Sequence, residues 1–153
     1  VWVDNQDHVW IIHRNDSLDP VEAAADAGTG ACCKKAPPII EFDAAGNVVN
    51  AWGGPGQGYD WPDSNHGIYA DTEGFVWIGG NGGTDGLVLK FTRDGKFVKQ
   101  FGRKGVKADS NATDHFFQVA KVFVDERANE LYVADGYGNK RVVVMDTETG
   151  QFK

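Results

Sequence analysis

Short runs of valine, isoleucine, leucine and aromatic residues alternate with polar turns along the chain. Runs of this kind, bounded by glycine, asparagine and aspartate, are typical of β-strands. They predict strand pairs at residues 1–4 with 9–12, 39–43 with 47–52, 67–71 with 75–78, 88–91 with 97–101, 122–125 with 131–134, and 142–146 with 151–152. A helical pattern at residues 21–27 lies inside a loop, so we expect an all-β protein.

The strand pairs repeat in sets of two, and the resulting set of four short strands describes one blade of a β-propeller. The 153 residues are therefore predicted to form one partial propeller with blades at about 1–53, 66–102 and 119–153, the last of them incomplete. Residues 15–38, 53–65 and 103–118 are predicted to be inserted loops, and long loops of this kind are often functional. Because three blades make roughly half of a ring, further blades of the same protein or a second chain would have to close it.

The charge of the chain argues against nucleic acid as a partner. The sequence has 15 lysine and arginine residues against 22 aspartate and glutamate residues, and the resulting formal net charge of −7 repels phosphate backbones. It contains no run of about 18 apolar residues, so it predicts no membrane span. The remaining partner classes are a small molecule, a peptide or another protein.

Aspartates mark the ends of the innermost predicted strands. Asp4, Asp71 and Asp125 follow the first strand of each blade. A carboxylate at such a position commonly accepts hydrogen bonds from the main chain of the next turn. We expect these three residues to be structural.

The order of the strands predicts which polar side chains meet. The start of an innermost strand and the end of the second strand lie on the same face of a propeller, because successive strands are antiparallel. His66 starts such a strand, His13 and Arg14 end the second strand of the first blade, and Tyr137 follows that of the third. Together they would offer a metal ligand, an anion-binding guanidinium and a proton-transfer group at the channel mouth. The alternative is that they are rim residues that make structural hydrogen bonds.

Four segments of the chain match motifs of one known family in the same order. They are Val9-Trp10-Ile11-Ile12-His13-Arg14, Asn65-His66-Gly67-Ile68, His115-Phe116-Phe117-Gln118 and Asp135-Gly136-Tyr137-Gly138-Asn139-Lys140-Arg141. With these motifs, the repeats resemble NHL repeats, and their order and inserts resemble the lyase domain of the peptidylglycine amidating enzymes, which is a six-bladed propeller. The similarity covers nearly the whole chain and implies the same fold.

The resemblance also implies roles for the matched residues. In those lyases the histidine at the position of His66 is one of three zinc ligands, the arginine at Arg14 contacts the substrate, and the tyrosine at Tyr137 is the proposed base. The reaction splits a C-terminal α-hydroxyglycine into a peptide amide and glyoxylate. Zinc lowers the pKa of a coordinated hydroxyl, a phenolate can take its proton, and arginine can pair with the substrate carboxylate. By the same resemblance, the main-chain carbonyls of Val1 and Ile68 would bind a calcium ion.

The chain departs from the family pattern at several positions. Two cysteines that pair in the family correspond to Phe117 and Gly138, so packing would replace the disulfide, and the proline before the zinc histidine is Asn65. The other two zinc histidines belong to blades beyond the last residue of this chain. Three functions therefore stay open: a zinc-dependent lyase, a propeller that binds a ligand or a protein without catalysis, and a structural component completed by another chain.

Five residues near the predicted channel mouth are candidates for contact with a ligand. They are His13, the loop aromatics Tyr59 and Trp61, and the adjacent Cys32 and Cys33 in a glycine-rich loop. The two cysteines can form a vicinal disulfide, stay as thiols or bond to another chain. An oxidised pair would indicate an oxidising compartment, so we expect a secreted or periplasmic protein.

Overall fold

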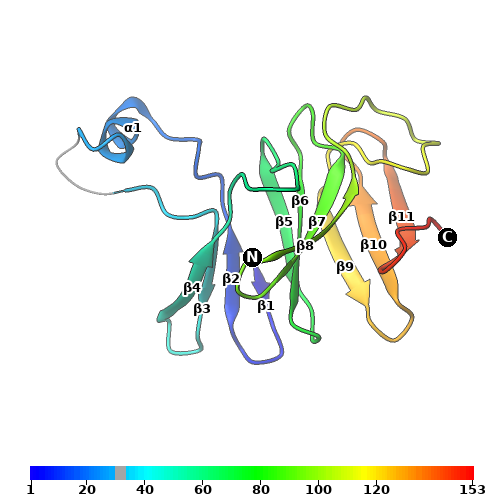
Figure 1. Cartoon of the computed structure of the whole chain (residues 1–153), viewed down its shortest axis with the longest axis horizontal. Coiled ribbons are helices and arrows are strands. Elements are labelled where there is room, and N and C mark those ends of the chain that lie inside the picture. Colours follow the sequence, from blue (N-terminus) through cyan, green and yellow to red (C-terminus); the bar gives the residue numbers. More distant parts are fainter. Residues whose placement is uncertain (30–33) are drawn as a thin grey trace.

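The computed structural model describes residues 1–29 and 34–153 of the chain. In this part, eleven strands form three antiparallel sheets, and one short helix lies apart from them (Figure 1). The first sheet contains β1 (Trp2–Val3), β2 (Val9–Ile12), β3 (Ile39–Phe42) and β4 (Val48–Trp52). The second contains β5 (Asn65–Ala70), β6 (Phe75–Gly80), β7 (Leu87–Thr92) and β8 (Phe97–Gly102), and the third contains β9 (Lys121–Asp125), β10 (Glu130–Asp135) and β11 (Arg141–Asp146). The predicted all-β class is confirmed.

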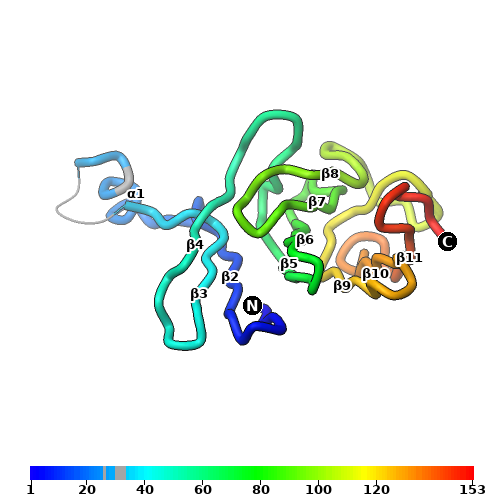
Figure 2. Tube along the Cα trace, turned by 60° about the horizontal axis from the view of Figure 1, so that its bottom comes forward, coloured from blue at the N-terminus to red at the C-terminus, as the bar shows by residue number. Residues whose placement is uncertain are grey.

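Each sheet keeps the order of its strands in the chain, as a blade-like sheet does. The three sheets stand side by side, with β5 next to β1 and β2 on one side and next to β9 on the other (Figures 1 and 2). The prediction of a strand at residues 151–152 was wrong, because Phe152 makes only a single bridge to Met145. The third sheet therefore has three strands among the described residues.

Helix α1 (Pro20–Asp26) lies in the predicted insert at residues 15–38 and agrees closely with the predicted helical segment. Its N-terminus is capped by Asp19, whose carboxylate accepts hydrogen bonds from the N–H groups of Val21 at 2.8 Å and Glu22 at 2.9 Å. Glu22 completes the capping box by accepting the Asp19 N–H at 2.9 Å. Within the described residues, no helix has the length and apolar content needed to cross a bilayer.

Two hydrophobic clusters fill the junctions between the sheets, and the second sheet contributes to both. Successive side chains of a strand point to opposite faces, so in β5 Ile68 packs toward the first sheet while Tyr69 packs toward the third. Trp77 in β6 belongs to the same cluster as Tyr69, and its ring stacks on that of Phe101 in β8 with the ring centroids 5.8 Å apart. Burial on both faces makes the second sheet the centre of the fold. The buried residues of the junction with the first sheet are Trp10, Ile39, Trp61, Ile68, Ala70, Val76, Ile78, Leu87, Leu89 and Phe91.

The aspartates at the ends of the innermost strands are structural, as predicted. Asp4, Asp71 and Asp125 each accept two hydrogen bonds from main-chain N–H groups of the following turn, at 2.7 to 3.2 Å. Asp4 also accepts the indole N–H of Trp10 at 2.9 Å, and Asp71 accepts that of Trp77 at 2.8 Å. These bonds fix all three turns and, in the first and second sheets, the tryptophan of the following strand.

Candidate functional site

A pocket of about 380 Å³ lies where the end of β2 meets the beginnings of β5 and β9. Five residues singled out in the sequence line it, namely Val1, His13, Arg14, His66 and Ile68. Asn65, Gly67 and Lys121 also line it. The antiparallel strand order thus brings residues from all three sheets to one opening.

Close contact between β5 and β9 creates the floor of this pocket. A Cβ at Gly67 would lie 2.7 Å from the carbonyl oxygen of Ala120 and 2.9 Å from the Cα of Lys121. Any side chain at position 67 would therefore push the two strands apart. Glycine allows the preceding residue, His66, to reach the main chain of the third sheet.

The imidazole of His66 bridges the second and third sheets. Its Nδ1 lies 2.6 Å from the carbonyl oxygen of Ala120, and its Nε2 lies 3.2 Å from the hydroxyl oxygen of Tyr137. The two rings meet edge to face, with centroids 5.4 Å apart and an interplanar angle of 78°. A carbonyl only accepts, so Nδ1 carries the proton, and in the neutral ring Nε2 accepts the phenolic hydrogen. The pair is a phenol with a proton acceptor already in place.

The turn that carries Tyr137 is held by a buried carboxylate. Asp135 is fully buried and accepts hydrogen bonds from the main-chain N–H of Phe117 at 2.7 Å, the amide of Asn139 at 2.8 Å and the guanidinium of Arg141 at 2.8 Å. Arg141 also donates to the carbonyl oxygens of Ser110, Ala112 and His115 in the insert at residues 103–118. Asp135, Asn139 and Arg141, which we call the clamp, therefore hold the turn that carries Tyr137 against the insert.

Phe117 and Gly138, the positions that correspond to paired cysteines in the family that the chain resembles, pack against each other. The ring of Phe117 lies against Gly138, where a Cβ would overlap ring atom Cδ1. A side chain at position 138 would displace that ring. The two substitutions relative to the family pattern thus fit each other sterically.

Arg14 and His13 line the pocket from the first sheet, where they follow β2. The guanidinium of Arg14 donates to the side-chain oxygen of Asn81 at 3.1 Å, and Nε2 of His13 donates to the carbonyl oxygen of Pro37 at 2.8 Å. Asn65 donates its amide N–H to the carbonyl oxygen of His13 at 2.9 Å. The side-chain oxygen of Asn65 is buried and has no hydrogen-bond partner in the described structure.

The charge of the pocket is opposite to that of the whole chain. Among the residues that line it in the described structure, the charged ones are Arg14 and Lys121, and there is no carboxylate. The formal net charge of the chain is −7. A cationic pocket on an acidic protein favours an anionic ligand over a cationic one.

Two residues predicted to contact a ligand, Tyr59 and Trp61, do not line this pocket. Trp61 is buried in the junction between the first and second sheets, 6.1 Å from Phe91. Tyr59 packs 4.8 Å from Phe97 and donates its hydroxyl hydrogen to the carbonyl oxygen of Gly54 at 2.9 Å. Both rings pack against the hydrophobic cluster between the first and second sheets, and Tyr59 also lines a separate pocket beside Gln100. Cys32 and Cys33 lie outside the described residues.

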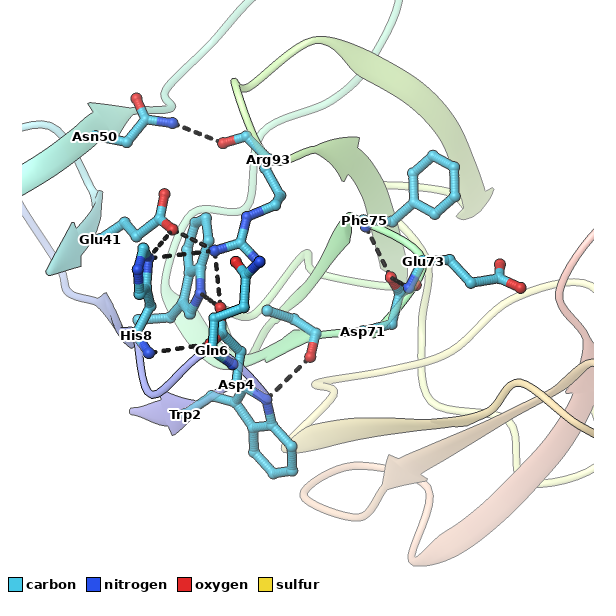
Figure 3. A network of polar contacts seen from close by, with 12 residues as sticks. Trp2, Asp4, Gln6, His8, Glu41, Asn50, Asp71, Glu73, Phe75 and Arg93 are labelled. Carbon is cyan, nitrogen blue, oxygen red and sulfur yellow. Dashed lines mark hydrogen bonds and ion pairs between the residues drawn. The ribbon is translucent and has the colours of Figure 1, made fainter. Parts of the chain in front are cut away.

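A second polar cluster lies at the other end of the first sheet (Figure 3). Arg93 donates to the carboxylates of Asp4, at 2.8 Å, and Glu41, and the Nδ1 of His8 lies 2.7 Å from the same Glu41 oxygen. Burial disfavours the charged form of Asp4, yet the bonds from Trp10, from main-chain N–H groups and from Arg93 hold its pKa below the ordinary value. Asp4, His8 and Glu41 have metal-ligating atoms within 4.8 Å of one another, but Arg93 already supplies the cation.

No protein-family model matches the chain. The amidating-lyase resemblance therefore stays a prediction that rests on the motifs. Sequence reasoning missed two residues of the site, Asn81 and Lys121. Asn81 follows β6 and Lys121 begins β9, so the strand-end rule that selected Arg14 and His66 would also have selected them.

Proposed function

We propose that this chain is part of an NHL-type propeller whose channel mouth binds a peptide or small molecule through a carboxylate group. The observation that carries the proposal is the cationic pocket, in which Arg14 and Lys121 are the charged residues. Arginine suits a carboxylate because its planar guanidinium can donate two parallel hydrogen bonds. His66 and Tyr137 would then lie beside the bound group.

The uncovered faces of the first and third sheets support the propeller. Ile11 in the first sheet corresponds to Ile78, which the second sheet buries against the first. Tyr132 in the third sheet corresponds to Trp77, which the second sheet buries against the third. One uncovered face is therefore equivalent to the Ile78 face of the second sheet, and the other is equivalent to its Trp77 face. At each inner junction, a face of one type already packs against a face of the other type. We propose that further blades of the same protein or a second chain cover them.

Replacing Arg14 by glutamine is expected to remove carboxylate recognition. The probes are an acetylated dipeptide that ends in glycine with a free carboxyl group, and the same dipeptide with a C-terminal amide. We expect the acid to bind the unaltered chain at least about 10-fold more tightly than the amide, since hydrogen bonds to charged groups contribute about 1.5 to 3 kcal/mol. Titration calorimetry or NMR titration measures both dissociation constants.

The control for this experiment is Arg127→Gln. Arg127 is exposed in the turn after β9, at the end of the strand remote from Lys121, so this variant loses the same charge without touching the pocket. We expect Arg14→Gln to bind acid and amide equally, and Arg127→Gln to keep the preference. An unaltered chain that binds the two probes equally, or binds neither, would contradict the proposed function.

Lyase chemistry of the amidating type is the second candidate, and the His66–Tyr137 pair favours it. The phenolic hydrogen of Tyr137 already points to an acceptor nitrogen 3.2 Å away. Tyr137 can therefore take a proton from a bound hydroxyl once its own proton has moved to His66. A zinc site of the resembled kind needs three protein ligands, and no group of three metal-ligating side chains that includes His66 occurs among the described residues. These residues by themselves do not fit such a zinc centre, and we derive no step through the metal.

Glyoxylate release from a peptide that ends in α-hydroxyglycine tests the second candidate. The lyase candidate predicts release by the unaltered chain, measured with and without added zinc, and a loss of about 100-fold or more in Tyr137→Phe, because general base catalysis typically contributes that much. The matched control is Tyr132→Phe, since the hydroxyl of Tyr132 bonds Glu130, whereas that of Tyr137 bonds His66, which lines the pocket. Binding of the acid probe without release would identify a binding module and exclude the lyase.

A further inference from the structure

Asn81 connects the three sheets behind Arg14, one of the residues that line the pocket. It follows β6, and its side-chain oxygen accepts hydrogen bonds from Arg14 at 3.1 Å and from the hydroxyl of Ser64 at 2.8 Å. Its main-chain oxygen accepts the side-chain N–H of Gln118, just before β9, at 3.1 Å. Arg14 comes from the end of the first sheet's second strand. One asparagine thus links residues far apart in the chain at the point where the ligand would bind.

The partner of Arg14 differs in charge from the partners of other arginines in this chain. Arg93, Arg103 and Arg141 each bond to a carboxylate. No carboxylate in the described structure lies within ion-pair distance of Arg14, whose side-chain partner is the neutral amide oxygen of Asn81. An amide orients a guanidinium without cancelling its charge, whereas a carboxylate would do both.

We propose that Asn81 is a positioning residue that holds Arg14 toward a ligand carboxylate while leaving its charge uncompensated. The guanidinium of Arg14 identifies the amide atom that it meets as the oxygen, because a guanidinium only donates, and the hydroxyl of Ser64 donates to the same oxygen at 2.8 Å and helps to hold it in place. The inference rests on the proposed function, since it assigns Asn81 a part in recognising the same carboxylate.

The backbone beside Asn81 is held in an unusual conformation. Gln118 has a φ of 62°, in the left-handed region that residues other than glycine seldom adopt. Its N–H donates to the carbonyl oxygen of Asp85 at 2.7 Å, which holds the residue there while its side chain reaches Asn81. Backbone conformations of this kind persist where surrounding contacts enforce them, and they cluster at ligand sites.

The decisive variant is Asn81→Asp, which is nearly isosteric. It keeps an acceptor oxygen for Arg14 and Ser64 but adds a negative charge beside the guanidinium. If Asn81 only ties the sheets together, the variant retains its contacts and the carboxylate probe binds as before. If Asn81 keeps Arg14 available, the new carboxylate competes with the ligand. We expect the affinity for the acid dipeptide to fall at least 10-fold, with the affinity for the amide unchanged.

The control is Asn111→Asp, which adds the same charge at an exposed position in the 103–118 insert. We expect it to retain the acid preference. The effect of Asn81→Asp should also vanish in the Arg14→Gln background, because no charge is then left to neutralise. If Asn81→Asp fails to fold, Asn81→Ser keeps a neutral oxygen at shorter reach, and we expect it to weaken acid binding by a few-fold without affecting the amide.

The outcomes separate this inference from the proposed function. Full acid affinity in Asn81→Asp, in a chain that distinguishes acid from amide, would overturn the role of Asn81 and leave the proposed function standing. A loss of the same size in Asn111→Asp would also overturn it, because the effect would then be one of overall charge. An unaltered chain without acid preference would refute the proposed function, and the role of Asn81 with it.

Discussion

Replacing Asp135 by alanine is expected to lower the free energy of unfolding by about 3 to 5 kcal/mol, which is the range for removing one partner of a buried ion pair. The Asp135 side chain is fully buried, and Arg141, its partner at 2.8 Å, has a side-chain exposure of 16%. Alanine would leave that guanidinium without a counter-charge. It would also leave the main-chain N–H of Phe117 and the amide of Asn139 without their acceptor.

Urea unfolding at neutral pH measures this loss, and Asp114→Ala is the matched control. Asp114 also pairs with an arginine, Arg103, but both side chains are more than half exposed. We expect the control to change the free energy of unfolding by less than about 1 kcal/mol, because water already solvates both charges. Equal losses in the two variants would show that burial of the Asp135–Arg141 pair does not determine its contribution.

The same substitution is expected to affect the site. Tyr137 lies in the turn between Asp135 and Asn139, both of which belong to the clamp. Loss of the clamp would release the turn and its contact with His66. Stability and the Tyr137 position are thus coupled through one carboxylate, so binding measurements on this variant need conditions in which it is folded.

Replacing Arg93 by leucine is expected to lower the free energy of unfolding by a similar amount, about 3 to 5 kcal/mol. Arg93 extends from the turn between β7 and β8 to Asp4 and Glu41 of the first sheet, whose side chains are 1% and 6% exposed. Leucine would leave two buried carboxylates that repel each other, with His8 as their remaining basic neighbour. The junction between the first and second sheets would be weakened where this network crosses it.

Arg103→Leu is the matched control, since Arg103 is exposed and pairs with the exposed Asp114. The main-chain oxygen of Arg93 also accepts hydrogen bonds from Asn50 and Trp52, at 2.7 and 2.9 Å, and the substitution leaves these in place. The difference between the two variants therefore reports the buried charges. A loss of less than about 1 kcal/mol in Arg93→Leu would contradict the ion-pair interpretation.

The pH dependence of the Arg93→Leu penalty provides a second measurement. The pKa of Asp4 is lowered in the folded chain, so its ionised form contributes stability above the unfolded-state pKa of about 4. That contribution is lost as the pH falls through the folded-state pKa. Trp10 and the main-chain donors remain in the variant, but the attraction between Arg93 and Asp4 requires the ionised carboxylate. We therefore expect the penalty to be full at pH 7 and to shrink below about pH 4. A penalty that stays constant into acid would mean that lost packing, not charge, is responsible.

The strands of this chain were predictable because their signal is local. Alternation with a period of two decides which residues of β5 and β6 face each neighbour, and aspartates at strand ends decide the turns. The segment at residues 151–152 did not form a full strand. Its two residues have no apolar run of their own, and Phe152 makes a single bridge.

Strand order also allowed part of the site to be predicted. The second strand of a blade ends on the face where an innermost strand begins. This rule predicted that His13, Arg14 and His66 lie together, and they line one pocket, with Tyr137 in contact with His66. It could not assign the loop aromatics. Tyr59 and Trp61 belong to an insert, whose path depends on which apolar surface it covers, and they pack into the core.

The sequence by itself thus determined the strands, the repeat and the residues at the strand ends, because each depends on neighbours a few positions away. The tertiary structure alone decided their partners: a carbonyl that sets the proton on His66, a neutral amide for Arg14, and a guanidinium for Asp4 and Glu41. These contacts join residues more than fifty positions apart in the chain. Hydrogen bonding and charge compensation at such range depend on how the sheets pack, and no local pattern encodes that.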